Sequence, residues 1–288
     1  MRPANLKPRL FLDGGNPDDT KDIIRLLGFL DGQTTNPTLI SKNPDLRERI
    51  ERGEKFTGKE ILGFYRQVVR KISALIPEGS VSVEVYADRS TRAEEMQEQG
   101  EEMFSWIPNA HIKFPSAREG LRAAEQAVKR GLRINMTLCF TQEQAAAVHA
   151  ATRGAKKGDV FVSPFIGRLD DRGENGMDLI YNIIRMYEKG EGHVEVLTAS
   201  VRNIDHLLYA LKLGSDIISS PFDILKQWAD QGLPIPGDNY VYDSKNLKRI
   251  FYKEIDLYQK WQNYDIRHEL TDQGMDRFSA DWNALFKK

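Results

Sequence analysis

Cysteine and histidine are scarce in this chain of 288 residues, which contains one cysteine, Cys139, and five histidines. A single cysteine excludes any disulfide within the chain and is typical of a reducing compartment, so we expect a cytoplasmic protein. No two histidines have the close spacing of a histidine metal site, and we therefore expect no bound metal. Any carbon–carbon bond chemistry in such a chain would therefore be expected to use an amine rather than a metal ion.

Long apolar runs and blocks of like charge are also missing. No stretch approaches the roughly 18 apolar residues of a membrane span, and residues 1–9 are basic but lack the apolar segment of a secretion signal. The 41 Lys and Arg residues are balanced by 42 Asp and Glu residues, for a net charge of −1. Because nucleic-acid binding needs a concentrated basic surface, we expect neither nucleic acid nor a membrane as a partner.

What the chain has is a repeated alternation of short apolar runs with longer amphipathic stretches. Such alternation is typical of parallel strands joined by right-handed helical crossovers, and eight units predict an α/β fold, a (β/α)8 TIM barrel. A doubly wound open sheet is the alternative, but no glycine-rich phosphate-binding motif follows the first run. We expect strands at residues 9–13, 33–36, 81–86, 111–114, 133–138, 159–163, 194–198 and 216–219, and helices at 17–28, 116–129, 142–151, 176–189 and 203–213.

No domain boundary is visible, so we expect one barrel domain over residues 1–288 with additional C-terminal helices. Its core would cover about 9–232, followed by a segment at about 234–270 with a charged helical pattern at 243–262. A last helix is expected over 271–286, capped by Thr271. Its apolar residues recur every three to four positions and must pack on the barrel or on a neighbouring subunit; they are Met275, Phe278, Trp282 and Leu285.

Lys113 lies in the middle of the apolar run Ala110–Pro115. A buried ammonium group is costly unless it is paired or loses its proton. A lysine in such a place is a candidate nucleophile that forms a Schiff base with a carbonyl substrate. The alternative is an edge residue whose amine reaches the surface.

Polar residues are concentrated at or near the ends of the other predicted strands, where a parallel barrel has its active site. An acid among valines, a strand lysine and an aspartate would each be expensive to bury alone, but they compensate one another around one cavity. A structural ion-pair network inside the barrel is the alternative. These candidates are Asp13, Thr34, Thr35, Asn36, Glu84, Asn135, Thr137, Ser163, Ser200 and Arg202.

Several sequence blocks resemble the transaldolase family. Leu30–Thr38 (LDGQTTNPT) contains the signature core D-G-x-T-T-N-P, and Val162–Asp171 and Ala199–Arg202 match two further blocks. Thr271–Trp282 is similar to the tail of the small transaldolase and fructose-6-phosphate aldolase branch. The resemblance covers about residues 9–232 and 271–286 and implies a class I aldolase barrel that acts on sugar phosphates without a metal or cofactor.

The resemblance also implies roles for individual residues. Lys113 would form the Schiff base with C2 of a ketose phosphate, and Asp13 would take the proton of the C4 hydroxyl. Glu84 and Thr137 would hold the water that relays protons. Asn36 and Asn135 would bind hydroxyls of the three-carbon unit, with Ser163 as a further contact, and Arg168 and Arg202 would bind the phosphate with help from Ser200. Thr35 and Phe165 would complete the substrate-binding residues.

Two positions separate the branches of the family. Glu84 and Phe165 resemble the transaldolases, whereas aldolase-type members have Gln and Tyr there. We therefore expect transfer of dihydroxyacetone from sedoheptulose 7-phosphate or fructose 6-phosphate to an aldose phosphate, as in the pentose phosphate pathway. The alternatives are an aldolase that releases free dihydroxyacetone, a sugar-phosphate-binding barrel without turnover, and a phosphate-binding barrel of another reaction class, such as an isomerase.

The chain departs from the family pattern in two places. Gly14 and Gly15 follow Asp13 where the family has Thr or Ser, which could loosen the adjacent loop or make room for another substrate. The segment at about 234–270 is absent from the short members, and we expect it to form an extra packed helix. In the small branch the last helix crosses to a neighbouring subunit, so a homo-oligomer through this helix is possible.

Overall fold

The computed structural model describes residues 2–286, and its eight parallel strands close into a barrel in chain order. The predicted (β/α)8 fold is therefore confirmed. β1 and β7 have the predicted bounds, and the other strands begin and end within two residues of them. The strands are β1 (Arg9–Asp13), β2 (Gly32–Thr34), β3 (Ser80–Glu84), β4 (Ala110–Pro115), β5 (Ile134–Cys139), β6 (Val160–Pro164), β7 (Val194–Thr198) and β8 (Ile217–Ser220).

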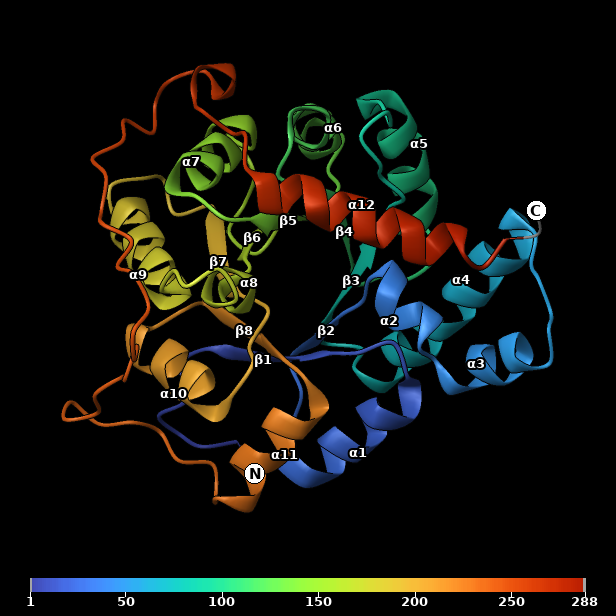
Figure 1. Cartoon of the computed structure of the whole chain (residues 1–288), viewed down its shortest axis with the longest axis horizontal. Helices are drawn as coiled ribbons and strands as arrows, with labels where there is room; N and C mark the ends of the chain where they lie inside the picture. Colours follow the sequence, from blue (N-terminus) through green and yellow to red (C-terminus); the bar gives the residue numbers. More distant parts are fainter. Residues whose placement is uncertain (1, 287–288) are drawn as a thin grey trace.

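Helices surround the barrel (Figure 1). They are α1 (Pro17–Leu27), α2 (Pro37–Ser41), α3 (Pro44–Glu51), α4 (Gly58–Leu75), α5 (Ala93–Phe104), α6 (Arg118–Lys129), α7 (Gln142–Ala151), α8 (Ile166–Asp170), α9 (Gly176–Tyr187), α10 (Ile204–Leu213) and α11 (Phe222–Asp230). α1 shows how local sequence sets their ends: Asn16 caps its first turn, Pro17 opens it and Gly28 ends it at φ +78°. No helix within residues 2–286 is long and apolar enough to cross a membrane.

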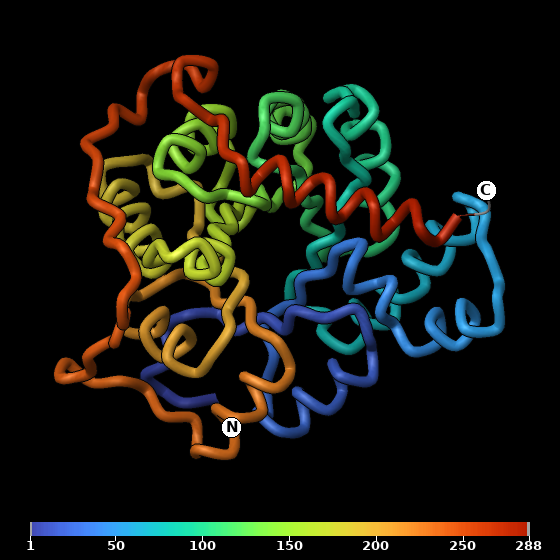
Figure 2. Tube along the Cα trace, viewed as in Figure 1, coloured from blue at the N-terminus to red at the C-terminus, as the bar shows by residue number. Residues whose placement is uncertain are grey.

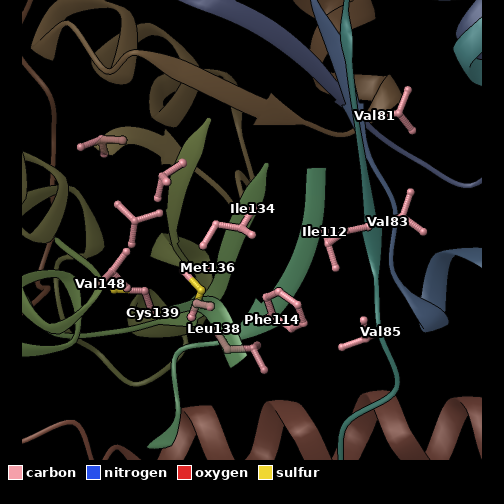
Figure 3. Packing of buried hydrophobic residues seen from close by; sticks show 14 of the residues in the cluster. Val81, Val83, Val85, Ile112, Phe114, Ile134, Met136, Leu138, Cys139 and Val148 are labelled. Carbon is pink, nitrogen blue, oxygen red and sulfur yellow. The ribbon is translucent and has the colours of Figure 1, made fainter. Parts of the chain in front are cut away.

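The strands divide their side chains between two environments because successive residues point to opposite faces. Apolar residues of β3, β4 and β5 pack outside the barrel against the helices (Figure 3); they include Val81, Val83, Ile112, Phe114, Ile134 and Met136. The alternate positions of the same strands carry Glu84, Lys113 and Asn135, which face the barrel interior. A separate apolar cluster fills the interior, and there Phe11 and Phe161 meet edge to face at 6.1 Å.

The last helix, α12 (Glu269–Asn283), crosses the front of the barrel in Figure 1, over the carboxyl-terminal ends of the strands. It begins two residues before the predicted start, because His268 caps it by accepting from the Leu270 amide. The expectation that Thr271 is the cap is wrong. The Thr271 hydroxyl instead donates to the Leu138 carbonyl (3.0 Å), and it accepts from Gln144 (2.8 Å).

The apolar stripe of α12 is buried within its own chain. The helix ends at Asn283, three residues before the predicted end, so Leu285 lies just beyond it. The four residues of the predicted stripe are each at most 7% exposed, and α12 makes its most extensive contact with α2. The stripe is thus covered by the barrel of the same chain rather than left free for another subunit; it consists of Met275, Phe278, Trp282 and Leu285.

Residues 234–267, here called the strap, run along the outside of α10, α9 and α7 (Figure 2). The predicted helix at 243–262 is wrong, because the only helical turn there is the 3-10 helix η1 (Trp261–Asn263). Side chains of the barrel helices bind the strap backbone instead: Asn182 donates to the Ile250 carbonyl (2.8 Å), and Gln142 accepts from the Lys253 amide (2.8 Å). These tertiary hydrogen bonds replace the i→i−4 bonds of a helix.

Candidate active site

A cavity of about 150 Å³ lies at the carboxyl-terminal ends of the strands, next to α12. An open groove of about 710 Å³ lies outside the barrel beside α6, but none of the predicted site residues lines it. Nine of the predicted residues line the smaller cavity: Asp13, Thr34, Asn36, Lys113, Ser163, Phe165, Arg168, Ser200 and Arg202. The chemistry of the lining, rather than the size of the hollow, identifies the candidate site.

Lys113 is buried and paired inside the barrel. The register of β3 and β4 sets Lys113 beside Glu84, and Nζ lies 2.7 Å from Oε2 of that carboxylate. Nζ also donates to the carbonyl oxygen of Thr35 at 3.0 Å. Burial raises the pKa of Glu84, and the charge of Lys113 opposes part of that rise. The two groups can therefore exchange a proton over a single short contact.

Asp13 supplies a second carboxylate at the end of β1. The register with β2 sets it beside Thr34, whose hydroxyl donates to Oδ1 at 2.7 Å. Burial raises the pKa of Asp13, while the Lys113 charge and the Thr34 hydrogen bond oppose that rise. The site thus combines one ammonium group with two carboxyl groups that are both more basic than usual.

Asn135, Ser163 and Thr137 lie on the neighbouring strands β5 and β6. Ser163 donates to Oδ1 of Asn135 (2.6 Å), and the Asn135 amide donates to the hydroxyl of Ser82 (3.1 Å). Thr137 is fully buried, and its hydroxyl has no hydrogen-bond partner within residues 2–286. A buried hydroxyl without a partner is costly, so this group is available to a ligand or to a reacting group.

Thr35 and Asn36 end the signature block but lie in different surroundings. The Thr35 hydroxyl bonds to Tyr65 (2.6 Å) and to the Ser82 carbonyl (2.7 Å), and its side chain does not line the cavity. Its backbone carbonyl, which holds Lys113, is its contribution to the site. Asn36 does line the cavity; its side-chain oxygen caps α2 through the Leu39 amide, and its NH₂ group stays available to a ligand.

Tyr65 is a residue that sequence reasoning missed. Its hydroxyl bridges two parts of the site, because it bonds to Thr35 and accepts from the backbone amide of Glu84 at 2.9 Å. A tyrosine in the helix α4 carries no local signal for such a contact. Only the packing of α4 against β3 brings it there.

Arginine side chains form the basic part of the cavity. Arg168 lies between the rings of Phe165 (5.5 Å) and Phe278 (5.4 Å), and Arg202 lies 3.1 Å from the exposed carboxylate of Asp171. A third arginine, Arg277 of α12, also lines the cavity. Sequence reasoning missed it because a single arginine next to an apolar stripe carries no signal that it faces a cavity.

The loop of Gly14 and Gly15 beside Asp13 is tightly held. The Gly14 amide donates to Thr34 (3.1 Å), and the Gly15 carbonyl accepts from Asn43 (2.8 Å). A Cβ at position 15 would lie 2.6 Å from the Leu39 carbonyl oxygen, so glycine permits the close approach of α2. The expectation of a loosened loop is therefore wrong.

Comparisons with known proteins identify the family of the chain. Residues 10–288 match the family model described as Transaldolase/Fructose-6-phosphate aldolase. A probable transaldolase from Dehalococcoides mccartyi is 34% identical, covering 97% of this chain and 100% of its own; one from Methanococcus maripaludis is 33% identical, with the same two shares. Among solved structures, a putative dehydratase from Mesorhizobium loti has a TM-score of 0.47 at 12% identity over 74% of this chain and 55% of its own, too distant to bear on function. The chain belongs to the transaldolase/fructose-6-phosphate aldolase family.

Proposed function

We propose that the protein is a transaldolase, which moves a dihydroxyacetone unit from a ketose phosphate to an aldose phosphate through a Schiff base on Lys113. The observation that carries this proposal is the buried contact of 2.7 Å between Lys113 and Glu84. Asp13 and the arginines line the cavity that Lys113 enters. The curated relatives named probable transaldolases support the same activity.

Schiff-base formation would begin with a proton transfer from the Lys113 ammonium to Glu84, whose raised pKa favours it. The free amine then attacks C2 of the ketose and forms a carbinolamine. Glu84 returns its proton to the C2 hydroxyl, which leaves as water, and the hydroxyl of Thr137 would hold that water. The product is an iminium ion on Lys113, with Glu84 again a carboxylate.

Cleavage would use Asp13 as the base. Its carboxylate takes the C4 hydroxyl proton while the electron pair of the C3–C4 bond moves to the iminium and leaves an enamine on Lys113. The aldose phosphate departs, and an acceptor aldehyde is attacked by the enamine carbon. Asp13 then returns its proton to the new C4 oxygen, and water hydrolyses the iminium. Its raised pKa suits a group that keeps a proton between two half-reactions.

Binding of the substrate would be divided between the two sides of the cavity. Asn36, Asn135 and Ser163 would bind the hydroxyls of the three-carbon unit. The phosphate would bind to the guanidinium groups of Arg168 and Arg202, whose planar donors suit phosphate oxygens, and to Ser200. The backbone of Ser200 has φ +60°, an unusual conformation for a residue other than glycine, and such strain is common at ligand sites.

The side chain at position 165 favours transfer of the dihydroxyacetone unit over its release, because it cannot position a water molecule. Phe165 lines the cavity and packs edge to face against Phe140 at 5.9 Å, so it offers no hydroxyl near the Schiff base. Without such a donor to position water, the dihydroxyacetone unit should remain on Lys113 until an acceptor arrives. An aldolase that releases free dihydroxyacetone is the alternative within the same family.

Borohydride trapping tests the proposal. The protein is incubated with fructose 6-phosphate, reduced, digested and analysed by mass spectrometry, with Lys113→Ala as the control. We expect a three-carbon adduct on Lys113, and no adduct in the variant. A folded protein that yields no adduct would overturn the Schiff-base chemistry, and steady turnover without an acceptor would overturn transfer in favour of aldol cleavage.

A further inference from the structure

α12 is fixed over the cavity by contacts at several points along its length. Thr271 donates to the carbonyl of Leu138, and Gly274 lies so close that a Cβ there would meet Cδ2 of Leu138 at 2.5 Å. Arg89 binds both carboxylate oxygens of Asp276, at 2.8 and 2.5 Å. A residue that α12 directs to the cavity is therefore held there by a docked helix and not by a loose tail.

Arg277 lies on this helix and lines the cavity with an exposed side chain. Within residues 2–286 it forms no ion pair. The acidic residues beside it on α12 are engaged elsewhere, since Asp276 is bound to Arg89 and Asp281 accepts a hydrogen bond from Thr38. The guanidinium of Arg277 thus faces the cavity without a carboxylate to neutralise it.

Arg168 also lacks a carboxylate partner among residues 2–286. It contacts the rings of Phe165 and Phe278, and within the described part of the chain it has no carboxylate at ion-pair distance. Burial lowers the pKa of Arg168, and the positive charges of Arg277 and Arg202 lower it further, while the charges of Glu84 and Asp171 oppose part of that lowering. Among the described residues, only Arg202 of the three has a carboxylate partner, Asp171 at 3.1 Å, so an anion bound between the three guanidinium groups would relieve their mutual repulsion.

We propose that Arg277 is a third arginine ligand of the substrate phosphate, so that α12 itself helps to select phosphorylated sugars. A phosphate monoester dianion has three terminal oxygens, each of which can accept from a guanidinium group. The identity of the sugar rests on the proposed function above. The binding of phosphate by Arg277 does not, because it needs neither Lys113 nor turnover.

Calorimetric titration with inorganic phosphate, at low ionic strength in a buffer without phosphate, tests this ligand. We expect Arg277→Gln to raise the dissociation constant roughly tenfold, the usual loss for one charge-assisted hydrogen bond, and Arg277→Lys to raise it less. The matched control is Arg66→Gln, which removes an exposed arginine of α4 that does not line the cavity, and it should stay within about twofold of the wild type.

Three results would overturn the inference: no saturable phosphate binding by the wild type, an Arg277→Gln variant of unchanged melting temperature that binds phosphate as well as the wild type, or an equal loss in Arg66→Gln.

A second readout compares borohydride trapping with fructose 6-phosphate and with fructose, both below saturation. Arg277→Gln should slow trapping of the phosphorylated sugar and leave trapping of fructose unchanged. Equal slowing with both sugars would contradict a role in phosphate binding. If the wild type formed no adduct with either sugar, the proposed function would fail, and the phosphate titration would still decide the role of Arg277.

Discussion

Replacing Lys113 by methionine would leave Glu84 without its partner inside the barrel. The two side chains are 4% and 6% exposed, and their charged atoms lie 2.7 Å apart. Methionine keeps much of the length of lysine but removes the charge, so the change acts on the ion pair more than on packing. Thr35 would lose a hydrogen bond to its carbonyl oxygen as well.

The expected loss of stability is large because the remaining carboxylate is buried. Removing one partner of a buried ion pair typically costs about 3–5 kcal/mol. Unfolding entropy of roughly 2.1 cal/mol/K per residue gives about 0.6 kcal/mol/K for 288 residues, so the melting temperature should fall by about 5–8 °C. The double variant Lys113→Met/Glu84→Gln should recover most of that loss, because glutamine leaves no buried charge.

The loss of stability in Lys113→Met should grow as the pH rises. Burial already raises the pKa of Glu84, and removal of Lys113 takes away the main opposing charge and raises it further. A carboxyl group whose pKa is higher in the folded than in the unfolded state favours folding while it is protonated, and this contribution is lost as the pH rises through the folded-state value. The deficit of Lys113→Met should therefore be small in acid and grow toward neutral and basic pH.

Urea unfolding of the wild type and both variants at pH 5 and pH 8 measures this deficit. Lys129→Met is a matched control, because Lys129 forms an exposed pair with Glu125 on α6 and should contribute little. A deficit of equal size at both pH values would refute the assignment to Glu84. So would a double variant that is no more stable than Lys113→Met.

Three further predictions concern the cavity and the core. Phe165→Tyr should raise acceptor-free release of dihydroxyacetone from fructose 6-phosphate by about tenfold, since its hydroxyl could position water; an unchanged rate in a coupled assay would contradict this. His206 accepts from the Arg202 amide at 3.3 Å, so His206→Ala should raise KM for the phosphorylated donor about fivefold and leave kcat unchanged, whereas a fall in kcat alone would argue against positioning. Burial raises the pKa of Cys139 to about 12, so iodoacetamide at pH 8 should label this thiol only after unfolding; labelling of the native protein would disprove its burial.

The barrel could be predicted because its signals are local. Each strand is a short apolar run, and caps such as Asn16 and Gly28 mark helix ends within a few residues. The cavity residues could be placed at strand ends for the same reason, since parallel strands bring those ends together. The pairing of Lys113 with Glu84 follows from the register of two strands, which the sequence alone does not state.

The conformation of the strap and the first residue of α12 could not be predicted, because contacts with residues distant in the sequence determine both. Residues 243–262 have a helical pattern, but Gln142 and Asn182 bind their backbone from the barrel helices. Thr271 is a suitable cap by residue type, but its hydroxyl is used to dock α12 on Leu138. A hydrogen-bonding group has a limited number of partners, and tertiary structure decides which ones it meets.

The position of α12 links the stability of the barrel to the chemistry of its cavity. Phe278 belongs to the buried stripe and also lies against Arg168, while the adjacent Arg277 faces the cavity. Because the stripe packs on its own barrel, its apolar surface is covered within the same chain. Changes that loosen α12 should therefore weaken phosphate binding within a single chain, even where every residue at the strand ends is intact.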